Sequence, residues 1–129
     1  MICGREFTVG FLGKKALPVI EVRPKRKFYD FKAKYTKGLT EYLVPAPIKP
    51  AFAQKLQKIA KRAHQVLKLR DLSRVDIMLD EAEQPFVLEV NSIPGFTETS
   101  LLPKAAKKVG INFDGLCLRI LNRARKRMR

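Results

Sequence analysis

Four polar side chains in the middle of the chain have the types and the spacing to hold a cation. They are Arg74, Asp76, Glu89 and Asn91, and we call them the polar set. Successive side chains of a β-strand point to opposite faces. The alternation of polar and apolar residues at 74–79 and 86–91 therefore predicts two strands that each present two members of the set on one face. With a turn at residues 81–84, the strands form an antiparallel hairpin in which Asp76 faces Glu89 and Arg74 faces Asn91.

The opposed carboxylates of Asp76 and Glu89 predict a metal site. Facing Cβ atoms in a sheet lie about 4.5–5.5 Å apart, where two carboxylates repel unless a cation lies between them. Mg²⁺ takes oxygen ligands, commonly one or two carboxylates together with phosphate oxygens, and Asn91 adds a third oxygen. The alternation alone leaves open an ordinary hairpin with a solvated polar face, on which Val87 would accompany Glu89. The charge distribution favours the metal, because residues 71–100 are acidic within a chain of net charge +15.

The segments around this hairpin predict the elements that position it. Residues 5–12 and 16–22 are rich in β-forming residues and are separated by a turn, which predicts a first hairpin, and Pro18 predicts an edge position or a bulge in it. Residues 51–69 have the apolar spacing of an amphipathic helix packed on the sheet. His64 lies among the polar positions of that helix, so we expect it at the surface.

Two further helices are predicted after the polar set. Ser100 would cap a short helix that begins at Pro103 and is ended by Gly110, and the free N–H groups at such a helix start favour anions. Asp114 would cap a last helix. That helix would turn its apolar residues inward, and these are Leu116, Ile120, Leu121 and Ala124.

Residues 24–50 are the least regular part of the chain and mix basic with aromatic side chains. An ordered segment of this kind could close as a lid over a phosphate-bearing substrate, or could stack the bases of a single nucleic-acid strand. The tail at residues 119–129 is also strongly basic, and it is interpreted either as a solvated helix end or as a nucleic-acid contact. Composition alone leaves the alternatives for residues 24–50 open, whereas for the tail it favours the solvated helix end.

The bulk properties indicate one domain of a soluble, cytoplasmic protein. The 129 residues contain no apolar run near the ~20 residues that span a bilayer, and no secretory signal precedes the first strand. Cys3 and Cys117 form neither a disulfide framework nor a zinc spacing. The net charge favours anionic partners without choosing among nucleotides, RNA and a membrane surface.

The sequence resembles the D-alanine–D-alanine ligases of the ATP-grasp superfamily over nearly its whole length. The resemblance is carried by REFTVGFL, by RVDIMLD and above all by EVNSIPGFTETSLLP. It implies an α+β fold, the C-terminal lobe of an ATP-grasp fold, with a mainly antiparallel sheet, packed helices and a long lid loop. It also implies ATP as cofactor and two Mg²⁺ ions, with Mn²⁺ as an alternative ion.

The resemblance assigns roles to individual residues. Asp76, Glu89 and Asn91 would hold the two Mg²⁺ ions, with Glu89 bridging them. Arg74 and the N–H of Gly95 would stabilise the oxyanion of a tetrahedral intermediate. The remaining assignments are Lys34 on the γ-phosphate, Tyr35 in closing the site, Ser100 and Leu101 on the carboxylate of the second D-alanine, and Glu6 on the ribose of ATP. The residues alone favour an exposed strand-end charge for Glu6, and the resemblance reverses that preference.

The implied reaction joins two D-alanines through an acyl phosphate, at the expense of ATP, to make a peptidoglycan precursor. Residues 1–129 would form a single partial domain, because the N-terminal substrate domain and the central ATP lobe of the family have no counterpart here. We therefore expect the isolated chain to be inactive or nearly so and to need the missing half as its partner. The resemblance also implies that the full-length enzyme is a homodimer. The alternative is a non-catalytic basic module of the same fold that binds RNA or a ribonucleoprotein.

Overall fold

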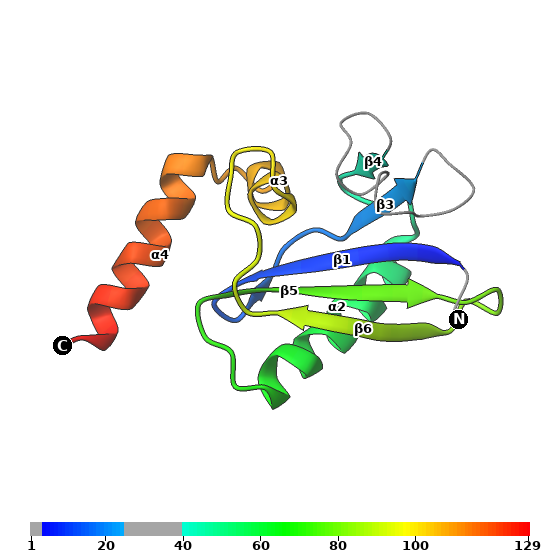
Figure 1. Ribbon diagram of the computed structural model, residues 1–129, viewed down its shortest axis with the longest axis horizontal. Helices are drawn as coiled ribbons and strands as arrows, with labels where there is room; N and C mark the ends of the chain where they lie inside the picture. Colours follow the sequence, from blue (N-terminus) through cyan, green and yellow to red (C-terminus); the bar gives the residue numbers. More distant parts are fainter. Residues whose placement is uncertain (1–3, 25–39) are drawn as a thin grey trace.

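The computed structural model describes residues 4–24 and 40–129, and these residues form one mainly antiparallel sheet with helices packed against it (Figure 1). The sheet has the order β4-β3-β1-β5-β6, and β2 pairs with β1. The strands are β1 (Arg5–Leu12), β2 (Lys15–Ala16), β3 (Ile20–Pro24), β4 (Thr40–Leu43), β5 (Leu72–Leu79) and β6 (Pro85–Asn91). The helices are α2 (Pro50–Val66), α3 (Leu101–Lys108) and α4 (Phe113–Arg127). The predicted α+β architecture is confirmed.

Helix α2 covers one face of the sheet and lies behind the strands in Figure 1. Its buried residues recur every four positions, at Leu56, Ala60 and His64, which is the spacing of one helix face. They pack on side chains that β1 and β5 present to the same side, including Phe7 and Ile77. This layer is the larger apolar core, and it leaves the other face of β1 and β5 free to carry polar residues.

The surface position predicted for His64 is wrong. Its side chain is only 3% exposed and stacks on the ring of Phe11 with the centroids 4.7 Å apart. Its Nδ1 lies 2.7 Å from the hydroxyl of Ser73 on β5. His64 continues the buried face of α2 by one further turn, so its ring reaches the sheet. The hydroxyl of Ser73 gives the ring nitrogen a hydrogen-bond partner there.

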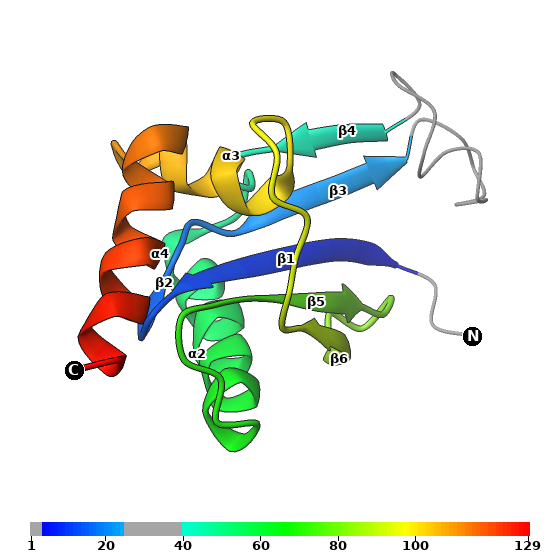
Figure 2. The ribbon, with the colours of Figure 1, turned by 60° about the vertical axis from the view of Figure 1, so that its left-hand side comes forward.

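Helices α3 and α4 form a second core on the opposite side of the sheet (Figure 2). Leu102 and Ala105 of α3 pack on Leu17 and Ile20, and Leu116 of α4 completes the cluster. Gly10 permits this close approach, since a Cβ there would lie 3.3 Å from Cδ1 of Leu102. The second core therefore fixes where α3 begins relative to β1.

Several predicted boundaries need correction. The run at residues 16–22 is split into β2 and β3 around Pro18, as a proline within a strand favours, and β4 was not predicted. Helix α3 begins at Leu101 rather than Pro103, and α2 ends at Val66. The cap of α4 is Asn112, whose Oδ1 accepts the N–H of Gly115 at 2.8 Å, rather than Asp114.

The basic tail is helical but is not simply solvated. Arg123 Nε lies 3.3 Å from Oδ1 of Asp71, and Arg127 also pairs with that carboxylate. Among the inward positions predicted for α4, Leu116 is buried and Leu121 is 64% exposed. Within the described residues, no helix combines the length and the apolar character needed to cross a membrane.

Candidate active site

The central hairpin of β5 and β6 has the predicted register at its functional end. Arg74 pairs with Asn91, and Asp76 pairs with Glu89. Strand β1 lies on the other side of β5 and sets Thr8 beside Asp76 and Gly10 beside Arg74. The polar set therefore lies on one face of the sheet, opposite the face that α2 covers.

A β-bulge interrupts the hairpin directly beyond Asp76. Val87 pairs with Ile77, so Leu88 is the extra residue of β6. The predicted alternation placed Val87 on the face of Glu89, and this is wrong. Because one residue is inserted, Val87 shares the face of Ile77, where it lines a surface groove with residues of α2 such as Ala63 and Val66.

Within residues 4–24 and 40–129, three hydrogen bonds hold the carboxylate of Asp76. Arg74 donates from Nε to Oδ1 at 3.0 Å and from Nη2 to Oδ2 at 2.9 Å. The hydroxyl of Thr8 donates to Oδ1 at 2.6 Å. Burial raises the pKa of Asp76, but the hydrogen bonds from Arg74 and Thr8 and the charge of Arg74 outweigh burial, so the pKa lies below its usual value. Asp76 is therefore ionised at neutral pH and suited to a cation.

Glu89 and Asn91 are the more accessible members of the polar set. Glu89 has a side chain that is 59% exposed, with Oε1 3.8 Å from Nη2 of Arg74. Asn91 is half-buried and accepts the N–H of Ile93 through Oδ1 at 3.1 Å. No cluster of three or more His, Cys, Asp and Glu side chains suited to a metal is found in the described part of the chain. The set of two carboxylates and one amide nevertheless has the donor chemistry of Mg²⁺, whose remaining ligands come from phosphates and water.

The loop after β6 brings backbone groups to the same place. Ser100 occupies the N-cap position of α3, as predicted, although its hydroxyl does not cap the helix and instead accepts the N–H of Thr97 at 3.0 Å. A Cβ on Gly95 would lie 3.2 Å from the Ser100 hydroxyl oxygen, so the loop folds tightly on itself. Helix α3 starts at Leu101 and presents its first turn, where backbone N–H groups lack helical partners.

One cavity of about 490 Å³ gathers all the predicted site residues that lie in the described part of the chain. They are Glu6, Arg74, Asp76, Glu89, Asn91, Gly95, Ser100 and Leu101. Lys34 and Tyr35 lie outside the described residues. The predicted residues thus come from three strands, a loop and a helix start, and the sheet brings them to one hollow.

The sequence reasoning missed several residues at this hollow. Val22, Tyr42 and Thr99 also line it, and Thr8 supports it through Asp76. The signal for Thr8 was present, because Glu6, Thr8 and Gly10 alternate with buried Phe7 and Val9 along β1. Tyr42 had no such signal, since its strand β4 was not predicted. Nζ of Lys104 lies over the ring of Tyr42, 4.7 Å from the ring centroid.

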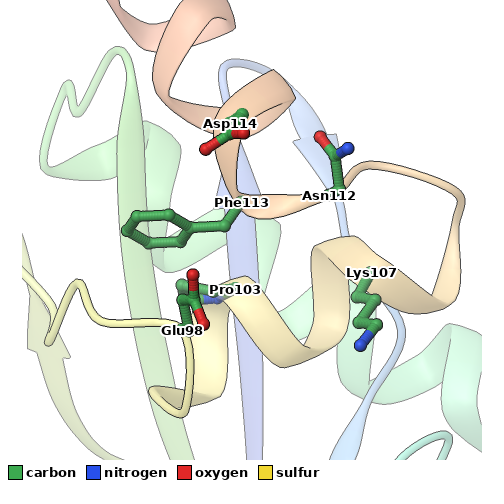
Figure 3. Close-up of a pocket in the computed structure, with 6 residues that line it drawn as sticks. All are labelled: Glu98, Pro103, Lys107, Asn112, Phe113 and Asp114. Carbon is green, nitrogen blue, oxygen red and sulfur yellow. The ribbon is translucent and has the colours of Figure 1, made fainter.

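A second, smaller hollow of about 250 Å³ lies behind the Gly95–Ser100 loop, between α3 and the start of α4 (Figure 3). Glu98 and Asp114 bring two carboxylates to it, and Lys107 brings one amine. Phe113 packs on Phe96 with ring centroids 5.3 Å apart. None of the predicted site residues lines this hollow.

Solved structures identify the class of fold. The D-alanine–D-alanine ligase from Bacillus anthracis complexed with ATP superposes with a TM-score of 0.81 and 29% identity, covering 98% of this chain and 40% of that protein. The VanG D-Ala:D-Ser ligase from Enterococcus faecalis gives 0.80 and 28%, over 95% of this chain and 36% of that one. The fold is therefore the C-terminal portion of an ATP-grasp ligase.

Sequence comparison identifies the family. A family model described as D-Ala D-Ala ligase C-terminus matches residues 1–122. The D-alanine–D-alanine ligase of Methylacidiphilum infernorum is 51% identical over 121 residues, which are 94% of this chain and 40% of that relative. The chain belongs to the D-alanine–D-alanine ligase family, and it spans about 40% of the length of the curated relatives it matches.

Proposed function

We propose that this chain is the C-terminal catalytic portion of an ATP-dependent, ADP-forming D-alanine–D-alanine ligase, which makes a peptidoglycan precursor. The single observation that carries the proposal is the cavity of about 490 Å³ that brings together metal-type ligands, a guanidinium and a helix start. Phosphoryl transfer to a carboxylate followed by acyl transfer needs those three components, because negative charge develops on oxygen in both steps.

Asp76, Glu89 and Asn91 would hold two Mg²⁺ ions, with Glu89 as the bridging ligand and Mn²⁺ as an alternative. When bound, the ions would neutralise charge on the phosphates of ATP. Asp76 and Glu89 are opposed across β5 and β6, so a cation between the two strands could take oxygen ligands from both. Glu6, which lines the same cavity, would hydrogen-bond the ribose of ATP.

Arg74 and the N–H of Gly95 would face the oxyanion of the tetrahedral intermediate. A planar guanidinium and a backbone amide donate hydrogen bonds from fixed directions, which stabilises charge as it develops. Ser100 and Leu101, at the start of α3, would hold the carboxylate of the second D-alanine. Lys34 would contact the γ-phosphate, and Tyr35 would help to close the site.

Activity would require the part of the relatives that this chain does not match. We propose that residues 1–129 form one partial domain, and that ATP is held only when the central ATP lobe and the N-terminal substrate domain are added. The complete enzyme would be a homodimer acting in the cytoplasm, where ATP is available.

A chimera tests this function. The matching 40% of the Methylacidiphilum infernorum ligase is replaced by this chain, and ADP release is measured with and without D-alanine. We expect D-alanine-dependent ADP release from the chimera and none from the isolated chain. Glu89→Gln is the matched control, because it removes the charge at constant size and should lower turnover by about 10²-fold or more.

A chimera that folds and stays monodisperse but releases no ADP with D-alanine would contradict the proposal. Nothing in the comparisons supports the RNA-binding alternative. The alternative would gain support if the isolated chain bound RNA in a salt-sensitive way and Glu89→Ala left that binding unchanged.

A further inference from the structure

We propose that Thr8 is a positioning residue that orients Asp76 toward the cation, an inference that rests on the proposed function of the polar set. Thr8 lies directly beside Asp76 in the pairing of β1 with β5, and its side chain is buried. Its hydroxyl donates to Oδ1 of Asp76 at 2.6 Å, which is the short distance of a bond to a charged acceptor. The alternative acceptor, the carbonyl of Val75, is farther away at 3.3 Å.

Counting donors shows which oxygen of Asp76 stays open. An ionised carboxylate has about four acceptor positions, two on each oxygen. Among the described residues, Thr8 and Nε of Arg74 occupy both positions of Oδ1, whereas Nη2 of Arg74 is the one donor to Oδ2. The position that remains is on Oδ2. Thr8 therefore favours coordination of a cation through one oxygen, Oδ2, over two-oxygen coordination.

Thr8 is also the more constant of the two donors. Arg74 already approaches a second carboxylate, with Nη2 3.8 Å from Oε1 of Glu89, and its proposed role requires it to donate to a reacting oxyanion. Thr8 is buried and has no proposed contact with substrate, and its branched Cβ restricts the χ1 angle of the side chain. If Arg74 turns toward substrate, the bond from Thr8 keeps Asp76 in place.

The test measures binding of Mn²⁺ in the presence of ADP to the chimera described above, whose C-terminal part is this chain with or without a substitution, from the electron paramagnetic resonance signal of free Mn²⁺. Thr8→Val removes the hydroxyl at nearly constant shape, and Thr8→Ser keeps it. Loss of an outer partner of a metal ligand typically weakens metal binding by about 10–100-fold. We expect that loss in Thr8→Val, affinity close to the unmodified chain in Thr8→Ser, and abolished binding in Asp76→Asn.

Thermal unfolding of each variant separates a positioning role from a role in folding. If the hydroxyl of Thr8 were only structural, its removal would lower the melting temperature without a matching loss of Mn²⁺ affinity in the folded protein. Thr8→Ala, which needs less space, replaces Thr8→Val if that variant does not fold. Equal Mn²⁺ affinity in Thr8→Val and the unmodified chain, with binding lost in Asp76→Asn, would overturn the role of Thr8 and leave the metal site standing. Absence of Mn²⁺ binding to the chimera that carries the unmodified chain would overturn both.

Discussion

Arg74 and Asp76, two residues apart on β5, are joined by two parallel hydrogen bonds of 3.0 and 2.9 Å. Both side chains are largely buried, with exposed fractions of 17% and 11%. Removing one partner leaves a buried charge that lacks its counterpart, so Arg74→Met should lower the free energy of unfolding by about 2–3 kcal/mol.

Urea unfolding of a double-mutant cycle checks this prediction. The pair Arg74→Met and Asp76→Asn should together cost less than the sum of the two single changes, because the double variant no longer buries a lone charge. Additive costs would show that the two side chains do not stabilise each other.

His64 predicts a loss of stability on mild acidification. Burial lowers the pKa of His64 from its ordinary value of 6.5, and the hydrogen bond to the backbone of Gly13 opposes this only in part. The folded state thus favours the neutral ring, so the contribution of His64 is complete above pH 6.5 and is lost as the pH falls through the lower folded pKa.

Urea midpoints measured from about pH 7.5 to about pH 5.5 should fall for the unmodified chain and fall less for His64→Gln. The interpretation is clean because the sequence contains one histidine. Buried Glu21, whose pKa is lowered by Arg5 and Arg23 against the effect of burial, acts in a lower window, below its ordinary 4.5. Parallel curves for the two proteins would refute the assignment.

Gly13 and Gly110 form a matched pair for testing how α4 is attached. Both have left-handed backbones, with φ of +62° and +81°, so alanine should cost about 1–2 kcal/mol at either position. A Cβ on Gly13 would also lie 2.5 Å from Cζ of Arg123, whereas nothing lies within 4 Å at Gly110. Gly13→Ala should therefore displace Arg123 from Asp71.

Thermal unfolding should show a larger cost for Gly13→Ala than for Gly110→Ala, by up to about 1 kcal/mol for the exposed ion pair. In an Arg123→Ala background the two costs should become equal. A difference that persists in that background would mean that Arg123 is not what Gly13 accommodates.

The groove between α2 and β6 exposes apolar side chains, among them Val66 at 71% and Leu67 at 55%. Val66→Lys should change the free energy of unfolding by no more than about 0.5 kcal/mol, because the side chain at this position is already largely in water. Leu56→Ala, at a fully buried position of the same helix, should cost about 2–5 kcal/mol. Comparable costs for both variants would contradict an open groove.

The functional end of the hairpin could be predicted because it depends on local alternation and on one turn. The register of Asp76 with Glu89 follows from those two features alone. The bulge at Leu88 could not be predicted, since no glycine or proline marks it. Sequence periodicity therefore located the carboxylates correctly and misplaced Val87.

Non-local pairing explains the other misses. Arg123 and Asp71 are separated by 52 residues, so no local pattern connects the basic tail to the start of β5. His64 is different, because its spacing of four from Ala60 already continues the buried stripe of α2. The prediction placed His64 at the surface because the side chain is polar. In the structure the hydroxyl of Ser73 on β5 provides the ring with a hydrogen-bond partner inside the core.

The extra residue Leu88 divides β6 into two segments whose side chains lie in different surroundings. Glu89 and Asn91 stay aligned with Asp76 and Arg74, while Val87 follows the packing surface of α2. The bulge therefore separates the residues that pack beside α2 from the residues that carry the polar set. Substitutions on the side of this strand that faces α2 can therefore leave the proposed metal ligands in place.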